Sequence, residues 1–204
     1  MKIYTKLISL ALIALVQVSL ATAATFDFSS YADHDTDNDG HYEWGYSKKK
    51  GFSVSEEGIQ LTVKAKAKYD NGDGFNKWRR AHAYLDRGNA GLGVCKIVNS
   101  SKQCAPSSDD NVTPNEMLLL NFHQTVKLEE IIFTNGTHGT TFNDKAKFDL
   151  KIFDQGSWGS WQKLSLINIF DSSILGEKFK FKNTNISNAN DFQFYISSMT
   201  VSAV

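Results

Sequence analysis

Residues 83–138 read AYLDRGNAGLGVCKIVNSSKQCAPSSDDNVTPNEMLLLNFHQTVKLEEIIFTNGTH, and this stretch decides the fold. It contains, in order, a glycine-rich turn, two cysteines, an acidic loop and a run in which apolar and polar residues alternate. Alternation with a period of two places every second side chain on the same face of a strand. The stretch therefore predicts half-buried β-structure, and its two cysteines are typical of an exported domain.

The same alternation recurs outside this stretch. Residues 58–69 alternate without a break, so their lysines are expected to face water, and the segments around residues 147–152 and 178–182 repeat the pattern. Further strands are expected near residues 26–28, 41–46, 78–85, 91–97, 117–122, 126–134, 161–169 and 192–201. Turn signals such as residues 38–40, 71–74 and 135–136 separate them. The sequence predicts an all-β fold, an antiparallel, jelly-roll-like β-sandwich of about ten strands.

One local signal favours a helix instead. Thr113, Pro114 and Glu116 have the spacing of a capping box with proline at the first helical position. The apolar run that follows is short and returns to strand character by Val126, which favours a strand. Both interpretations remain open from the sequence.

The N-terminal residues have the form of a signal peptide. Lys2 and Lys6 precede an apolar stretch from Leu7 to Leu20, which is shorter than the roughly 20 residues that cross a bilayer, and small residues follow up to Ala23. We expect cleavage after Ala23 and a single secreted domain over residues 24–204, without a membrane span. The expected location is extracellular in a bacterium, with the periplasm as the alternative.

The charge balance argues against one class of partner, and the two cysteines predict a disulfide. The chain has 22 basic and 22 acidic side chains, so nothing draws the whole molecule toward nucleic acid, which is not an expected partner. In an oxidising compartment Cys95 and Cys104 are expected to form a disulfide, the alternative being two separate thiols. The sequence leaves the oligomeric state open.

Three acidic loops, residues 33–40, 70–74 and 107–111, are candidates for calcium, the one cofactor that the sequence suggests. Residues 33–40 place carboxylates at alternate positions before a glycine, which suits a hard cation with oxygen ligands. An EF-hand is excluded, because Tyr46 stands where a bidentate glutamate belongs. The alternative is an acidic, solvated turn. The candidate ligands are Asp33, Asp35, Asp37, Asp39, Asp109 and Asp110.

Tryptophans are the candidate sugar-binding residues. The chain has four, and Trp158 and Trp161 flank a glycine-serine turn, where exposed indoles would stack on sugar faces. Trp158 is the one expected to be exposed. The alternative is that they are core residues or cross-strand pairs.

Catalytic motifs are missing from the sequence. There is no HExxH or GxSxG pattern, and residues 88–93 are glycine-rich without the order of a dinucleotide site. A glycosidase would need two carboxylates some 5 to 10 Å apart, and Glu43 and Glu116 would be the candidates. Their expected roles are a strand surface charge and a turn hydrogen bond.

Residues 83–134 resemble the extracellular domains of PEP-CTERM, exosortase-sorted bacterial proteins. The resemblance lies in Tyr84-Leu85-Asp86, in the segments 91–95 and 108–112, and in residues 116–122 and 191–196. The Pro-Glu-Pro motif, hydrophobic helix and basic tail of that family are not found before Val204, so the resemblance does not imply surface anchoring. It implies a setting in exopolysaccharide and biofilm matrix.

The leading hypothesis is a secreted, non-enzymatic β-sandwich of the bacterial extracellular matrix or envelope that binds polysaccharide with calcium support. Its loops would carry the binding residues. The alternative hypothesis is a polysaccharide-acting hydrolase or lyase on a jelly-roll fold, because a fold does not fix a function.

Overall fold

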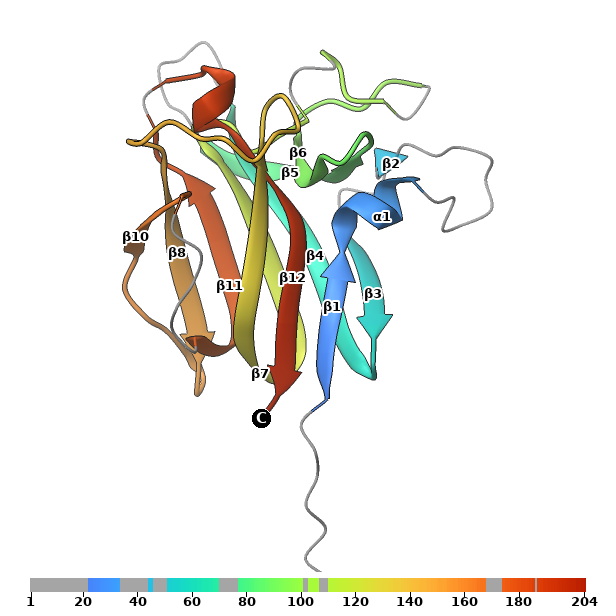
Figure 1. Cartoon of the computed structure of the whole chain (residues 1–204), viewed down its shortest axis with the longest axis vertical. Helices are drawn as coiled ribbons and strands as arrows, with labels where there is room; N and C mark the ends of the chain where they lie inside the picture. Colours follow the sequence, from blue (N-terminus) through green and yellow to red (C-terminus); the bar gives the residue numbers. More distant parts are fainter. Residues whose placement is uncertain are drawn as a thin grey trace, which may run out of the picture.

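The computed structural model describes residues 22–33, 44–45, 51–69, 77–100, 103–106, 110–167, 174–185 and 187–204. Every strand pairing in these residues is antiparallel, which confirms the all-β prediction. The described strands are β1 (Ala23–Asp27), β2 (Trp44–Gly45), β3 (Phe52–Glu56), β4 (Ile59–Tyr69), β5 (Lys77–Asp86), β6 (Gly91–Cys95), β7 (Glu116–Asn135), β8 (Lys147–Asp154), β9 (Ser157–Trp158), β10 (Gln162–Ser165), β11 (Ile174–Asn183) and β12 (Phe194–Ala203). A short helix, α1 (Phe28–Asp33), follows β1 (Figure 1).

The long strand β7 connects the two layers of the sandwich. Its first half pairs with β4 and its second half with β12, while β11 runs along its other edge (Figure 1). Two strands were expected here, over residues 117–122 and 126–134, and that expectation was wrong. The polar segment 123–125 forms a bulge within β7, because Val126 pairs with Gly176 and Asn121 with Lys178, so β7 has more residues than β11 between these two pairs. Such an irregularity bends a sheet without ending the strand.

The interior is formed by the apolar positions of the alternating strands. Val63, Leu150 and Phe181 are all fully buried, as the sequence predicts. Aromatic rings fill the centre, where Phe133 lies edge-on or tilted against Phe148 and Phe194 with ring centroids 5.0 and 5.4 Å away. The alternate positions of the same strands point outward, so the fold itself creates a polar outer surface on these strands.

The capping-box sequence forms a turn that leads into a strand. The Thr113 amide donates a hydrogen bond to Glu116 Oε2 at 2.7 Å, as a capping box would require, but β7 begins at Glu116. Asn115 has a φ of 70°, a left-handed conformation that stops helix growth. The strand interpretation is therefore correct, and so is the turn hydrogen bond expected of Glu116.

The glycine-rich segment and the disulfide pack the loops at one end of the sandwich. Cys95 and Cys104 form the expected disulfide. Gly93 lies on β6 directly under the backbone of Asp110, and a Cβ at residue 93 would stand 1.9 Å from the Asp110 carbonyl oxygen. Gly91 has a φ of 110° and a similarly close neighbour in the Ile196 carbonyl. These glycines therefore serve packing, as expected of a strand-entry turn.

The N-terminal elements and one later strand differ from expectation. β1 begins at Ala23, and α1 was not predicted; Asp27 Oδ1 accepts a hydrogen bond from the Ser30 amide and so caps the helix. Within the described residues 161–167, the strand expected over residues 161–169 is limited to β10. None of the described helices is long and apolar enough to span a bilayer.

Candidate functional site

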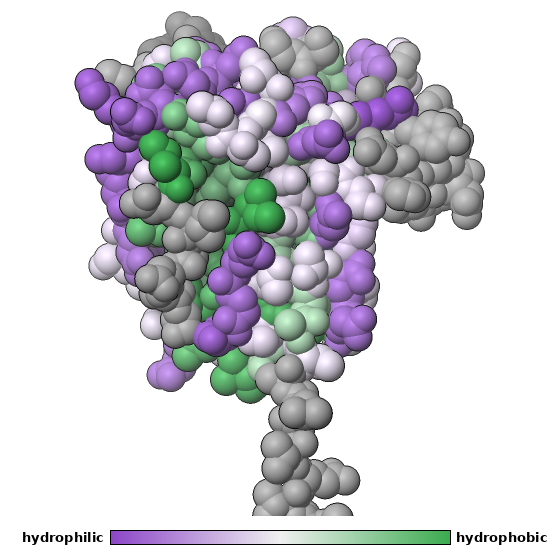
Figure 2. Space-filling view, in the orientation of Figure 1, coloured by the Kyte–Doolittle hydropathy of each residue, from purple (hydrophilic) through white to green (hydrophobic). Residues whose placement is uncertain are grey.

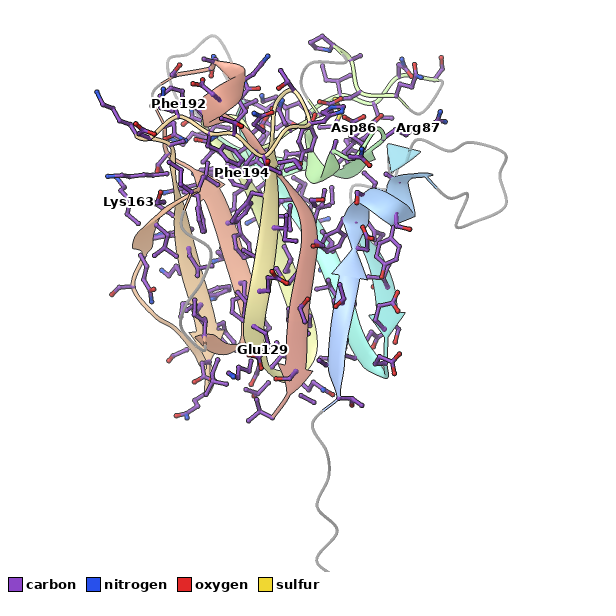
Figure 3. The ribbon with its side chains drawn as sticks, in the orientation of Figure 1. Asp86, Arg87, Glu129, Lys163, Phe192 and Phe194 are labelled. Carbon is purple, nitrogen blue, oxygen red and sulfur yellow. A yellow bond between two sulfur atoms is a disulfide. The ribbon has the colours of Figure 1, made fainter. Side chains whose placement is uncertain are left out.

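The outward positions of β4, β5, β8, β10 and β11 form a surface rich in cations and aromatic rings, which we call the basic aromatic face. β4 and β11 contribute the lysines Lys64, Lys66, Lys68, Lys178, Lys180 and Lys182. The neighbouring strands add Arg80, Lys151, Lys163 and Phe153, and the rings of Trp78, Trp158 and Trp161 lie along it. Lys163 projects from β10 at the left-hand edge in Figure 3, and hydrophilic side chains line that edge in Figure 2.

Strand register aligns these cations in rows across the sheet. One row runs from Lys64 across Leu119 to Lys180 and Lys151. A second row runs through these residues: Arg80, Lys66, Met117, Lys182, Asp149 and Lys163. Strands lie about 4.8 Å apart, so the second row spans roughly 24 Å. Met117 and Leu119 form an apolar floor beneath the lysine stems.

The face is poorly neutralised. The two rows of cations contain one carboxylate, Asp149, whose Oδ2 lies 3.1 Å from Lys182 Nζ. Lys180 and Lys151 are direct cross-strand partners, an arrangement of like charges that destabilises a sheet. The pKa of Lys180 is lowered, first by burial and then by the positive charges of Lys151 and Lys66.

The aromatic rings on this face are in contact with the ammonium groups. Lys180 Nζ lies 3.6 Å from the centroid of the Trp158 ring, and Lys182 Nζ lies 4.4 Å from that of Trp161. The negative ring faces attract these cations. The indoles thus hold the lysines in place, and the ammonium groups cover part of the ring surface that could stack on a sugar.

A hollow of about 490 Å³ lies at one end of the face, within the size range of small-molecule binding sites. It is lined by Lys68, Trp78, Pro114, Asn115, Lys182, Asn183, Thr184 and Asn185. The side chain of Trp78 is 37% exposed there.

Hydrogen bonds fix the rim of this hollow. The Asn183 amide donates to the carbonyl oxygens of Val112 and Phe192, and the Asn185 amide donates to that of Lys147. A rim that is held in this way needs little further ordering when a ligand binds.

The tryptophans predicted to bind sugar lie on this face, but with different exposure from that expected. Trp158 is half-buried and packs edge-on against Phe153, with ring centroids 5.3 Å apart. Trp161 is the exposed one of the pair, at 39%. Sequence reasoning did not select Trp78, because its role depends on Lys182 and Asn185, which are more than 100 residues away in the chain.

Most of the predicted calcium ligands lie outside the described residues. Asp35, Asp37, Asp39 and Asp109 are not described, nor is the side chain of Asp33. Within the described part of the chain, no three histidine, cysteine, aspartate or glutamate side chains are placed to hold a metal ion together. The calcium prediction therefore stays a prediction.

Asp110 belongs to a second group of charged residues, which we call the acidic cluster: Asp86, Asp110, His138 and Tyr195. The Tyr195 hydroxyl donates a hydrogen bond to Asp110 Oδ1 at 2.6 Å, and His138 Nε2 lies 3.1 Å from Asp86 Oδ2. Burial, followed by the charge of Asp86, raises the pKa of Asp110 to about 6. Figure 3 shows Asp86 at the β6 end of the sandwich, opposite Glu129.

The two glutamates considered as catalytic candidates are not brought together in the described residues. Glu116 is fully buried, with Oε1 2.6 Å from Lys96 Nζ, and Glu43 lies outside the described residues. Neither Asp86 nor Asp110 lines the hollow beside Trp78.

A second hollow, of about 400 Å³, lies beside the second half of β7. Ile132 and Ile167, 39% and 46% exposed, lie along it together with Thr140 and Asp144. Hydrophobic side chains are visible on this side of the molecule in Figure 2. It has none of the cations or indoles of the basic aromatic face.

Comparison with known proteins gives no family. No family model and no curated protein matches the chain. One solved structure that is similar is the family 32 carbohydrate-binding module from C. perfringens NanJ in complex with galactose. The alignment covers 70% of this chain and 92% of that one, with 15% identity and a TM-score of 0.36. At that level the similarity carries no argument, and the fold is assigned from this chain's own strands.

Proposed function

We propose that this chain is a secreted, non-enzymatic β-sandwich protein of the bacterial extracellular matrix or envelope that binds polysaccharide through the basic aromatic face. One observation carries the proposal: the hollow beside Trp78 has the volume of a small-ligand site, an indole on its wall and a preformed polar rim. Sugar sites combine an aromatic surface with a few fixed polar groups in this way. Lys182 lines the hollow and contacts Trp161, so the two aromatic positions belong to one surface.

The test is a glycan array that holds neutral and acidic polysaccharides, followed by titration of each hit with tryptophan fluorescence as the signal. We expect Trp78→Ala and Trp161→Ala each to weaken binding about 10-fold, the loss expected when an aromatic contact is removed. Leu175→Ala is the matched control, because Leu175 is 45% exposed but lies at the far end of β11. A blank array, with fluorescence unmoved by any polymer, would refute the proposed function.

Calcium support from the acidic loop at residues 33–40 is a second part of the proposal. A cation that binds only the folded chain raises the melting temperature by mass action. We therefore expect a higher melting temperature in millimolar calcium than in chelator. Identical melting curves would remove calcium from the proposal and leave the sugar-binding part intact.

A further inference from the structure

The charge of the basic aromatic face restricts the kind of polysaccharide that it fits. The outward positions of its strands hold ten cations, the nine named above and Lys147 of β8, against two carboxylates, Asp149 and Asp86 at the far end of β5, although the whole chain has 22 of each sign. Among the described residues, Lys182 is the one cation of the face with a carboxylate partner. The excess of positive charge is therefore local to this surface, and it is available to a ligand.

The arrangement of these cations in the sheet lowers the stability of the fold when no anion is bound. Lys180 and Lys151 are opposite each other on adjacent strands, in the interior of the sheet, where like charges repel. The lowered pKa of Lys180 has the same origin, after burial. An anionic group placed between the two ammonium groups would remove this repulsion.

The rings also favour a charged sugar over a neutral one. A neutral sugar stacks on a bare indole, but the Trp158 ring has an ammonium group 3.6 Å from its centroid. An acidic sugar can pair its anion with that ammonium group while its carbon skeleton lies against Met117, Leu119 and the ring edges. The same covered ring surface is a poor platform for nucleic acid bases, which need an open face.

From these observations, and resting on the proposed function, we infer that the basic aromatic face binds an acidic polysaccharide, whose carboxylate or sulfate groups lie on the lysine rows. The row from Arg80 to Lys163 would follow the polymer across the sheet. The hollow beside Trp78 would hold one sugar unit, with Lys68 and Lys182 beside its acidic group.

The experiment compares polymers that differ in charge alone: polygalacturonate against its methyl ester, and dextran sulfate against dextran. All are titrated into the full-length mature chain in chelator, so that calcium cannot crosslink the polymer. We expect each charged polymer to bind at least about 10-fold more tightly than its neutral counterpart, and the difference to shrink as salt is raised from 50 to 500 mM. Tighter binding of dextran sulfate or of polygalacturonate distinguishes sulfate from carboxylate.

Two arginines on one strand give a matched pair of variants. Arg80 is paired with Lys66 on the basic aromatic face, whereas Arg79 is paired with the buried Ala67 and is exposed on the opposite side of β5. Because only one of them faces the polymer, Arg80→Gln should weaken binding of the acidic polymer about 3-fold, and Arg79→Gln should leave it unchanged. The double variant Lys66→Gln, Lys180→Gln should lose about 10-fold, with melting curves recorded for every variant.

The remaining outcomes would overturn either the inference alone or the proposed function as well. Equal binding of charged and neutral polymers, or equal effects of Arg79→Gln and Arg80→Gln, would overturn the inference and leave the proposed function standing. Failure to bind any polymer would overturn both. Tighter binding of an oligodeoxythymidine than of any polysaccharide, with the same loss in the variants, would assign the face to nucleic acid.

Discussion

The acidic cluster and the basic aromatic face are both groups of charged side chains, but they are stabilised differently. In the acidic cluster, each carboxyl group has a polar partner from another element: the Tyr195 hydroxyl for Asp110 and the His138 ring for Asp86. On the basic aromatic face, cations lie beside cations, and aromatic rings take the place of counter-ions. Polar groups that are buried and bonded within the chain affect the stability of the fold, whereas surface charges without a counter-ion are available for binding. Substitutions in the first region should therefore change stability, and substitutions in the second should change binding.

The largest effect is expected from the glycine that lets the Asp110 loop approach the sheet. In Gly93→Ala the new Cβ would stand 1.9 Å from the Asp110 carbonyl oxygen, which forces the loop away from β6 and from Tyr195. We expect the free energy of unfolding in urea to fall by about 3 kcal/mol. Gly159→Ala is the control, because its nearest neighbour would be a comfortable 3.6 Å away. Wild-type stability of Gly93→Ala would contradict this packing.

The next effect is a pH dependence that originates in Asp110. The pKa of its carboxyl group is raised to about 6 in the folded chain from 3.8, so the folded state holds a proton that the unfolded state has lost. Its contribution to stability is therefore complete below pH 3.8 and is lost as the pH rises through 6, by about 3 kcal/mol in all.

Asp110→Asn tests this assignment by urea denaturation at several pH values. An amide oxygen still accepts the Tyr195 hydrogen bond but does not titrate, so the variant should lose this component of the pH dependence. The groups facing Asp110 are Asp86 from β5, Tyr195 from β12 and His138 from the loop after β7, and they are unchanged in the variant. Parallel stability profiles for the variant and the wild type would show that the pH dependence comes from elsewhere.

A smaller loss is expected from Tyr195→Phe, which removes the hydroxyl and keeps the buried ring. Asp110 then loses a hydrogen bond of 2.6 Å, and the free energy of unfolding should fall by about 1.5 kcal/mol. The affinity for the acidic polymer should not change, because Tyr195 lies outside the basic aromatic face. A loss of affinity in the folded variant would mean that the two regions are coupled.

The comparison also shows which parts of the molecule the sequence can predict. The buried and exposed positions of β4 follow from its alternation alone, because strand geometry makes every second side chain equivalent. The disulfide follows from the two cysteines and the expected export of the chain. The turn at Thr113 and Glu116 was identified locally, but whether a helix followed depended on β4 and β11, which flank Leu118 in the sheet.

The candidate site was predictable only in part, because it depends on contacts between distant residues. The lysine rows are visible in each strand separately, but their alignment requires the register of β4, β7, β11 and β8. Trp78 becomes a candidate only when the end of β11 is placed beside it. In the sequence, Asp110 belongs to an acidic loop, whereas its burial depends on Tyr195, 85 residues away.

The smallest effect, and the one of opposite sign, is expected from Lys151→Gln. Removing this charge relieves the repulsion with Lys180 across β8 and β11, so the free energy of unfolding should rise by about 0.3 kcal/mol at low salt, and the gain should vanish at high salt. The same change should weaken binding of an acidic polymer and raise the pKa of Lys180, which is measurable by NMR titration of its side chain.

Lys127→Gln is the control for this substitution, because Lys127 is paired with Glu129 at 2.8 Å and lies outside the basic aromatic face. Its removal should bring no gain in stability and no loss of affinity. If Lys151→Gln is more stable but binds more weakly, the face has a charge arrangement that lowers stability and serves ligand binding. A destabilised variant would instead show that the ring contact of Lys151 with Trp161, 5.6 Å from ammonium to centroid, outweighs the repulsion, and the contrast between the two regions would fail.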